Sequence, residues 1–434
     1  MNFSANSEKY MKHLLEQFEK SNTKKTPRLQ KKMDDYLSNI YADIHESYNY
    51  IETTKNRSTR ITFKLSKIRI PEQIPKGNLF DSSFVPYTIK RYIEQHAVFH
   101  LTYKCKLEEL PVTINFVLLS ESEFLKPEKY ENYVERILVW LKMCKQYSVN
   151  GCTSKTLDLY FYLTPFKKRL PESSITVIGP ENVNSGVTIA CGEHGEILIF
   201  REEEWFKVFI HETMHSFGLD FSLMDTTLIH NRIKYIIPVL SDVNVHEAYS
   251  ETWARIMNVL FCSFYMLENK TDRENFLLYS NFCLQFEKEF AVFQIVKVLF
   301  FMGLQYEYLY IDSANADVVR KMLYKEKTNV LAYYILTGIL MSDIPEFLRW
   351  CSEHNSSFVG FTKTLSNLDS FYLLIERQYM HKKLLYSVER YEKFLRGMID
   401  FIENKETGSN KNVDTERNEK RELSDSMRMS ICEI

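Results

Sequence analysis

The chain has 434 residues and a formal net charge of -2, with 45% hydrophobic and 26% charged residues. This composition is typical of a globular chain and excludes a disordered or fibrous one, and the length predicts two or three lobes. The 12 glycines argue against a Gly-rich nucleotide-binding fold, and the near-zero charge gives no electrostatic basis for nucleic acid as the main partner.

The cysteines and the apolar stretches indicate the cellular compartment of the protein. The eight cysteines are scattered with no C-x-x-C pair, so we expect neither a cysteine zinc site nor a disulfide framework. We expect Cys191 to be a buried, small hydrophobic residue. The N-terminus is polar and lacks a signal-peptide core, and no stretch has the roughly 20 apolar residues that a membrane span needs. These features predict a soluble, reduced, intracellular protein with no signal peptide and no membrane span.

Residues 1–85 are predicted to form a helical and extended region, and residues 86–225 an α/β lobe with a mainly antiparallel sheet. The expected strands are short runs rich in β-branched and aromatic residues, and the expected helix repeats its apolar residues at spacings of three and four. A connection with two glycines at residues 191–196 predicts a hairpin. The strands are expected at residues 97–103, 112–118, 157–163, 175–178, 187–190 and 197–200, and the helix at residues 127–147.

The next segment, residues 202–217, has helical period and three acidic residues in its first turn, where they complement the helix dipole. Gly218 follows where a helix C-cap needs a positive φ. Strand signals end near residue 245, so residues 226–404 are predicted to form a helical C-terminal lobe. Residues 405–434 are polar and charged and are predicted to be a disordered tail. The fold class is therefore α+β.

The segment most informative about chemistry is His211-Glu-Thr-Met-His215. On a helix, two histidines four residues apart project from one face and can hold one zinc ion. Glu212 faces the same cleft without ligating, so it can take a proton from a water on the metal. The flanks from Val208 to Phe217 carry no other charge, as a buried metal helix requires.

A third ligand is expected from a second helix that begins near Asn244. Glu247 and Glu251 are four residues apart on that helix and share a face. If Glu247 binds zinc, Glu251 can accept the outer ring N–H of a ligating histidine and fix its tautomer. The reverse assignment, with Glu251 as the ligand, stays open.

Together these residues resemble the zincin metallopeptidases, specifically the gluzincin branch, which pairs H-E-x-x-H with a glutamate on a downstream helix. The Glu247-Ala-Tyr-Ser-Glu251 block is similar to the glutamate helix of thermolysin-like and anthrax lethal-factor-like proteases, and the likeness covers about residues 208–257. The 31 residues between His215 and Glu247 are a longer gap than the thermolysin type has. A Phe-, Tyr-, Asn- and Lys-rich zincin with a helical C-lobe also resembles uncharacterised proteins of large DNA viruses.

The resemblance implies a zincin-like N-terminal lobe, one Zn²⁺ ion, and hydrolysis of a peptide or protein substrate with Glu212 as general base. Gluzincins often stabilise the oxyanion with a Tyr or His, for which Tyr249, His246 and Tyr235 are candidates. The rival metzincin pattern, H-E-x-x-H-x-x-G-x-x-H/D, matches only as far as Gly218, because its third ligand position is Phe221 and Asp220 lies one place early.

Two alternatives to a peptidase remain. One is a zincin-fold protein without activity that serves as a binding or structural module. The other is a helical scaffold whose histidines never meet a metal.

Overall fold

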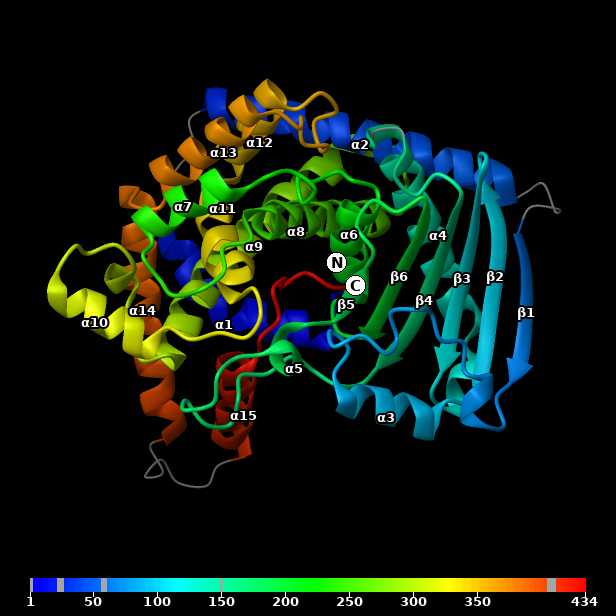
Figure 1. The fold of residues 1–434 in the computed structure, drawn as a ribbon, viewed down its shortest axis with the longest axis horizontal. Helices are drawn as coiled ribbons and strands as arrows, with labels where there is room; N and C mark the ends of the chain where they lie inside the picture. Colours follow the sequence, from blue (N-terminus) through cyan, green and yellow to red (C-terminus); the bar gives the residue numbers. More distant parts are fainter. Residues whose placement is uncertain (1–2, 22–26, 56–60, 149–150, 404–410) are drawn as a thin grey trace.

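The computed structural model describes residues 3–21, 27–55, 61–148, 151–403 and 411–434, which form an α+β protein. The described residues build one six-stranded sheet in the order β1-β2-β3-β4-β6-β5, which stands beside a larger helical half (Figure 1). Its strands are β1 (Ile61–Lys67), β2 (Phe99–Leu107), β3 (Leu110–Leu118), β4 (Thr156–Thr164), β5 (Gly186–Thr188) and β6 (His194–Arg201).

The sheet is mixed and differs from the expected, mainly antiparallel sheet in two pairings. β1–β2, β2–β3 and β5–β6 are antiparallel, whereas β3–β4 and β4–β6 are parallel. Parallel neighbours need a crossover connection, and α4 (Pro127–Tyr147) provides it between β3 and β4. The hairpin predicted at residues 191–196 joins the antiparallel pair β5 and β6, which leaves β5 at the end of the sheet.

Helices cover both faces of the sheet. Leu159 and Phe161 of β4 belong to the large core that includes α4 and α6 (Trp205–Ser216), while Tyr162 packs on the opposite face in a smaller core with α3 (Tyr87–His96). This division follows from the alternation of side chains along a strand. The sheet therefore presents one face to α6, the helix that carries the histidine pair.

The remaining helical elements were predicted only in outline. The α-helices are α1 (Ala5–Ser21), α2 (Pro27–Lys55), α5 (Pro180–Val183), α7 (Thr227–Ile236), α8 (Val245–Tyr265), α9 (Arg273–Phe301), α10 (Ala314–Leu323), α11 (Thr337–Met341), α12 (Ile344–His354), α13 (Leu365–Gln378), α14 (Lys382–Glu403) and α15 (Lys411–Asp425). A π-helix, η4 (Leu331–Leu336), runs directly into α11. The short 3₁₀ helices are η1 (Pro71–Gln73), η2 (Glu121–Leu125) and η3 (Tyr306–Leu309).

The histidine helix begins later than its sequence pattern predicts. The three glutamates at residues 202–204 lie in the turn before α6, and Glu204 takes a left-handed φ of 58° at the N-cap. The helix ends at Ser216, and Gly218 has a φ of +60°, as expected for a residue that stops a helix.

One strand prediction was wrong, and one strand was missed. Residues 175–178 do not form a strand: Ile178 makes one isolated bridge to Glu326, and Ile175 is 91% exposed. The chain has left the sheet at this point and contacts the helical half instead. Conversely, β1 is an edge strand that was not expected, although Ile61, Phe63 and Leu65 alternate with polar residues, and its side chains are mostly exposed.

No described residue after Arg201 belongs to a strand of the sheet, in agreement with the predicted helical second part. Among the described helices, none is by itself long and apolar enough to cross a membrane. One pair, Leu331–Met341 with Ile344–His354, meets that test only when joined, across a bend of 94°.

The prediction of a disordered C-terminal tail was wrong for the described part of it. Residues 404–410 lie outside the described residues, but residues 411–425 form α15, and Ser426 to Cys432 are all buried. The charged residues that suggested disorder occupy α15, where many are exposed, whereas the last nine residues run through the interior.

The expectation that Cys191 is a buried, small hydrophobic residue was also wrong, because the chain forms one disulfide although it has no disulfide framework among its described residues. Cys152 and Cys191 are joined, with their Cα atoms 4.3 Å apart, and Cys191 is half-buried rather than a buried free thiol. The β5–β6 turn folds against the loop before β4, where the Thr153 N–H donates to the carbonyl of Gly192 over 2.6 Å. This contact brings together two cysteines that are 39 residues apart in the sequence.

Candidate metal centre

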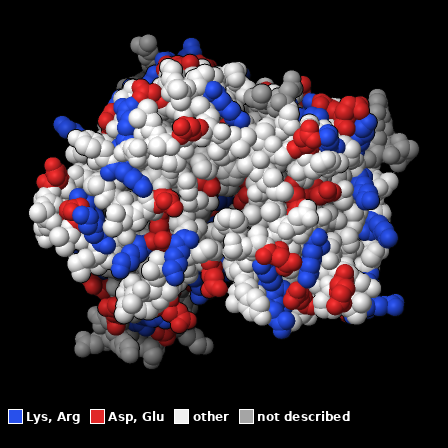
Figure 2. Space-filling model, in the orientation of Figure 1, with Lys and Arg blue, Asp and Glu red and all other residues white. Residues whose placement is uncertain are grey.

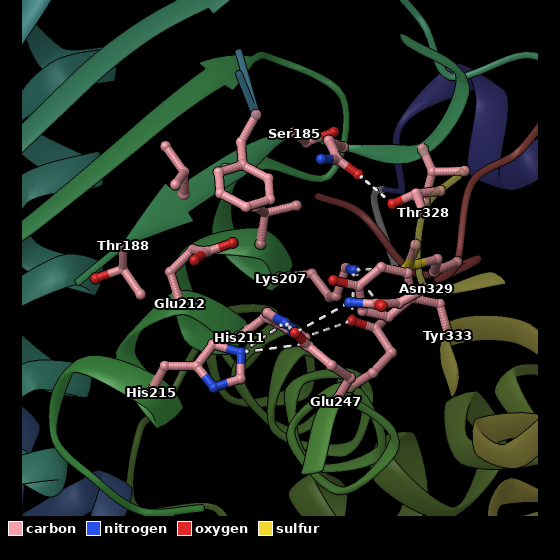
Figure 3. Close-up of a pocket in the computed structure, with 18 of the residues that line it drawn as sticks. Ser185, Thr188, Lys207, His211, Glu212, His215, Glu247, Thr328, Asn329 and Tyr333 are labelled. Atoms are coloured by element: carbon pink, nitrogen blue, oxygen red, sulfur yellow. Dashed lines mark hydrogen bonds and ion pairs between the residues drawn. The ribbon is translucent and has the colours of Figure 1, made fainter. Parts of the chain in front are cut away.

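The packing of α6 against α8 brings together the two histidines and one of the two predicted glutamates (Figure 3). His211 Nε2 lies 3.1 Å from His215 Nε2 and 3.1 Å from Glu247 Oε2, and His215 Nε2 lies 3.2 Å from the same oxygen. The Asn329 amide donates to the other oxygen of Glu247 over 3.2 Å and so holds the carboxylate in this orientation. His211, His215 and Glu247 thus surround one point.

These three atoms fit the ligand set of a zinc ion. A zinc ion about 2.0–2.1 Å from each of three tetrahedral ligands would hold the ligand atoms about 3.3 Å apart, close to the spacing of these atoms. Two imidazole nitrogens and one carboxylate oxygen also make a donor set that zinc commonly takes. The three lone pairs converge in a buried place, where a cation would relieve their mutual repulsion.

The outer nitrogen of each imidazole is held by a second carboxylate. His211 Nδ1 lies 3.0 Å from Glu251 Oε2, and His215 Nδ1 contacts Asp220 Oδ2. A carboxylate accepts a hydrogen bond, so the proton of each neutral ring belongs on Nδ1, and Nε2 presents its lone pair to the centre. Glu251 therefore lies on the far side of the His211 ring from the point that Glu247 faces.

Both of these outer carboxylates are themselves anchored. The Lys207 ammonium, one turn before His211 on α6, donates to the two oxygens of Glu251 over 2.8 and 3.0 Å. The Ser222 backbone N–H and hydroxyl donate to Asp220 Oδ1 over 3.2 and 2.8 Å. The imidazoles are thus oriented by a network that is buried almost throughout.

The electrostatics of the centre favour a positive charge. Burial alone would lower the pKa of both imidazoles, but Glu247 and Glu251 raise the pKa of His211, and Glu247 and Asp220 raise that of His215 well above its usual range. Burial alone would raise the pKa of Glu247, yet the two histidines hold it well below its usual range. In Glu212, by contrast, burial outweighs its neighbours and raises the pKa.

Glu212 points away from the histidine–glutamate group toward β5 (Figure 3). A Cβ atom added to Gly186 would lie 2.9 Å from Glu212 Oε1 and 2.8 Å from Val208 Cγ1, so only glycine leaves room for the carboxylate there. The Ser185 carbonyl and the Ile189 N–H bond to β6, so the backbone groups of Gly186 and Thr188 point to the open edge. Among the described residues no strand pairs with this edge.

A pocket of about 240 Å³ lies between β5, α6, α8 and η4 and contains the centre. Figure 2 shows that this face of the molecule is hollowed between the sheet and the helical half, with acidic and basic side chains interspersed around it. His211, Glu212, His215 and Glu247 all line the pocket. Tyr333 of η4 lines it as well, and its ring centroid lies 5.7 Å from that of His211.

Of the three residues suggested for oxyanion binding, only His246 lines this pocket. Tyr249 lies outside it: the residue is fully buried, and its hydroxyl donates to the Val359 carbonyl over 2.6 Å and accepts from Asn355 over 2.8 Å. Tyr235, on α7, is 86% exposed and does not line the pocket either.

No sequence pattern assigned a role to Lys207 or Tyr333, and Asp220 was noted only because it lies one place before the third ligand position of the metzincin pattern. Lys207 could have been noticed as a charge on the apolar face of a buried helix. Asp220 follows the histidine helix by a short turn, but its contact with His215 depends on the left-handed turn at Gly218. Tyr333 is one of 27 tyrosines and lies about 120 residues after the motif, so no local signal identifies it.

No protein-family model, no curated protein and no solved structure matches this chain.

Proposed function

We propose that the protein is a zinc-dependent metallopeptidase of gluzincin type, with His211, His215 and Glu247 as zinc ligands and Glu212 as general base. The observation that carries the proposal is the convergence of two imidazole Nε2 atoms and one carboxylate oxygen within 3.1–3.2 Å of one another, each ring backed by a carboxylate. Such backing orients the rings and raises their basicity as ligands.

The edge of β5 supports a peptide as the substrate. An extended peptide can pair with an open strand edge through its backbone, and this gives affinity that is independent of its sequence. The free backbone groups of Gly186 and Thr188 lie beside Glu212, so a peptide paired there would pass the candidate centre. The mixed charges around the hollow also give no basis for a polyanion as the ligand.

The chemistry would be divided among the residues of the pocket. A bound Zn²⁺ ion would polarise the scissile carbonyl and lower the pKa of the attacking water. Glu212 takes the proton of that water and passes it to the leaving amine. The Tyr333 hydroxyl is a candidate donor to the developing oxyanion because Tyr333 lines the pocket beside His211; burial raises its pKa well above the usual range, so the hydroxyl is protonated. His246 is a second donor at the same pocket.

The test compares zinc content and peptide cleavage in three full-length variants. Glu212→Gln should retain one zinc per chain and lower the cleavage of a mixture of unstructured peptides by at least about 100-fold, because it removes the general base. His211→Ala should lose both zinc and cleavage. Glu268→Gln, at an exposed glutamate, is the matched control and should change neither.

The outcomes separate the alternatives. Zinc at one equivalent with no cleavage of any peptide by the wild-type chain would favour a binding or structural module. A wild-type chain that takes up no zinc would refute the metallopeptidase altogether. Cleavage that survives in Glu212→Gln would refute the role of general base.

A further inference from the structure

The last nine residues, 426–434, cross the interior beside the candidate centre. In Figure 1 this red segment leaves α15 and runs between the sheet and the helical half, and near its end the Glu433 carbonyl accepts from the Ser4 N–H over 2.8 Å. Met427, Arg428, Ser430 and Ile431 have no exposed surface. Apart from a bridge between Arg169 and Ser426, the described segment belongs to no sheet and no helix.

Its backbone is instead bonded by buried side chains of other elements. Glu204 Oε1 accepts from the N–H groups of residues 429 and 430, and Glu287 Oε1 accepts from those of residues 431 and 432. The Asn258 amide donates to the carbonyl of Cys432 over 2.8 Å, and the Tyr334 hydroxyl donates to that of Met427 over 2.7 Å. Hydrogen bonds to the backbone N–H and C=O groups of an extended segment are also the contacts by which proteins bind extended peptides.

The same contacts reach the start of the histidine helix. Glu204 is the residue before α6, its carboxylate also pairs with the buried Lys168, and its own N–H donates to Glu433 Oε1 over 3.0 Å. Its left-handed conformation is one that a non-glycine residue holds only when its surroundings enforce it. The segment therefore helps to fix where α6 begins.

A second path runs through Met429. This side chain lines the pocket, and its sulfur lies 3.4 Å from the Lys207 ammonium. Lys207 in turn holds Glu251, which faces His211 Nδ1. The position of the segment is thus connected to the orientation of a candidate zinc ligand through Lys207 and Glu251.

We propose that residues 426–434 act as a docked peptide whose seating assembles the candidate metal centre, so that release of the segment switches the centre off. This proposal rests on the zinc site proposed above. Met427, Met429 and Ile431 pack in the main core. The carboxylates of Glu204 and Glu287 would lose buried hydrogen-bond donors without the segment, which is strongly unfavourable. These contacts favour one specific seating of the segment.

The experiment displaces the segment in the full-length chain. Ile431→Asp places a carboxylate beside that of Glu287, which should release the segment. We expect the amides of residues 429–432 and of α6 to lose hydrogen-exchange protection, and zinc affinity to fall at least tenfold. A synthetic peptide with the sequence of residues 426–434 should restore both, whereas a peptide of scrambled order should not. Asn418→Asp, on the exposed side of α15, is the control and should behave as wild type.

A milder variant covers the case in which Ile431→Asp fails to fold. Met429→Ala keeps the backbone contacts and removes the contact with Lys207, so it should lower zinc affinity severalfold and raise exchange within α6. Unchanged zinc affinity and unchanged α6 exchange in whichever variant folds would overturn the proposal, and so would a released segment that the native peptide cannot replace. If the wild-type chain binds no zinc, the proposed function fails, and exchange in α6 with rescue by the peptide still decides whether the segment controls this helix.

Discussion

At the scale of single residues, the carboxylates behind the two imidazoles decide which nitrogen faces the centre. Asp220 Oδ1 receives two hydrogen bonds from Ser222, which leaves Oδ2 for His215 Nδ1. In Asp220→Asn the amide oxygen would keep the Ser222 contacts and turn its NH₂ group toward His215. The ring would then carry its proton on Nε2, where the metal lone pair is needed.

We therefore expect Asp220→Asn to lower zinc affinity about 10- to 100-fold, as is usual when a residue that supports a ligating histidine is changed. The affinity can be measured by competition with a chelator of known strength. Asp225→Asn is the matched control, because Asp225 is exposed and an asparagine can still accept from the Thr227 N–H at the start of α7. Equal zinc affinity in Asp220→Asn and wild type would contradict the assigned role of this carboxylate.

Gly186 is the second residue whose identity the site requires. An alanine there would bring its Cβ within 2.9 Å of Glu212 Oε1 and of Ile199 Cδ1. We expect Gly186→Ala to reduce peptide cleavage more than tenfold while one zinc stays bound, because the crowding displaces the base and not the ligands. Overpacking of this kind should lower the free energy of unfolding by about 1–3 kcal/mol.

Gly179→Ala is the appropriate comparison for that variant, since the nearest atom to its added Cβ would be 3.7 Å away. Cleavage kinetics and urea unfolding of the two variants should be measured together. If both glycine variants cleave as fast as wild type, the carboxylate of Glu212 does not depend on its position against β5.

At the scale of elements, the beginning of η4 is held by a buried acid. Glu326 Oε2 accepts from the Leu331 N–H over 2.8 Å, and burial raises the pKa of Glu326 to about 7. The folded state therefore retains a proton that the unfolded chain has lost above its pKa of 4.5. Stability that depends on this group is present below about pH 4.5 and is lost as the pH rises to about 7.

This pKa shift corresponds to a loss of about 3 kcal/mol in the free energy of unfolding between pH 4.5 and pH 7. We expect the free energy of unfolding of wild type, relative to Glu326→Gln, to fall by about this amount over that interval, because glutamine does not titrate. Denaturant unfolding at a series of pH values measures it, with Glu307→Gln at an exposed site of η3 as the control. A constant difference between wild type and Glu326→Gln across the interval would show that the buried acid does not titrate there.

Elements were predictable where their signal is local. The helix at residues 127–147 and the histidine pair on α6 follow from spacings of three and four, and both are observed. The start of α6 was not predictable, because Glu204 is held before the helix by contacts with residues 429 and 430. The prediction of a strand at residues 175–178 was wrong for a similar reason. The segment makes a long-range contact, because Ile178 forms an isolated bridge with Glu326 in the helical half.

At the scale of the whole molecule, the parts of the site that sequence analysis missed are those that long-range packing brings in. The motif predicts His211, Glu212 and His215, and the second helix predicts Glu247 with Glu251 as the alternative. Tyr333 and the segment at residues 426–434 reach the pocket from the other half of the fold. The same holds for Cys152 and Cys191, whose pairing depends on the β5–β6 turn rather than on a sequence pattern.

The candidate ligands also join the two parts of the fold. His211 and His215 lie on α6, which packs on the sheet, and Glu247 lies on α8, which runs through the helical half. A metal bound by all three would stabilise the contact between these parts, and an ion that binds only the folded chain adds free energy according to its concentration. At a free zinc concentration about 1,000-fold above the dissociation constant, the gain is about 4 kcal/mol.

For a chain of 434 residues, this gain should raise the unfolding temperature by roughly 4 °C. We expect this rise in unfolding temperature with Zn²⁺ in wild type and no rise with Zn²⁺ in His211→Ala. The rise with Mg²⁺ in wild type should be much smaller, because Mg²⁺ prefers oxygen ligands. Calorimetry at several zinc concentrations measures it. A zinc-dependent shift of equal size in His211→Ala would place the stabilising ion elsewhere, because only His215 and Glu247 would remain at this site, and two protein ligands in place of three would hold zinc much more weakly.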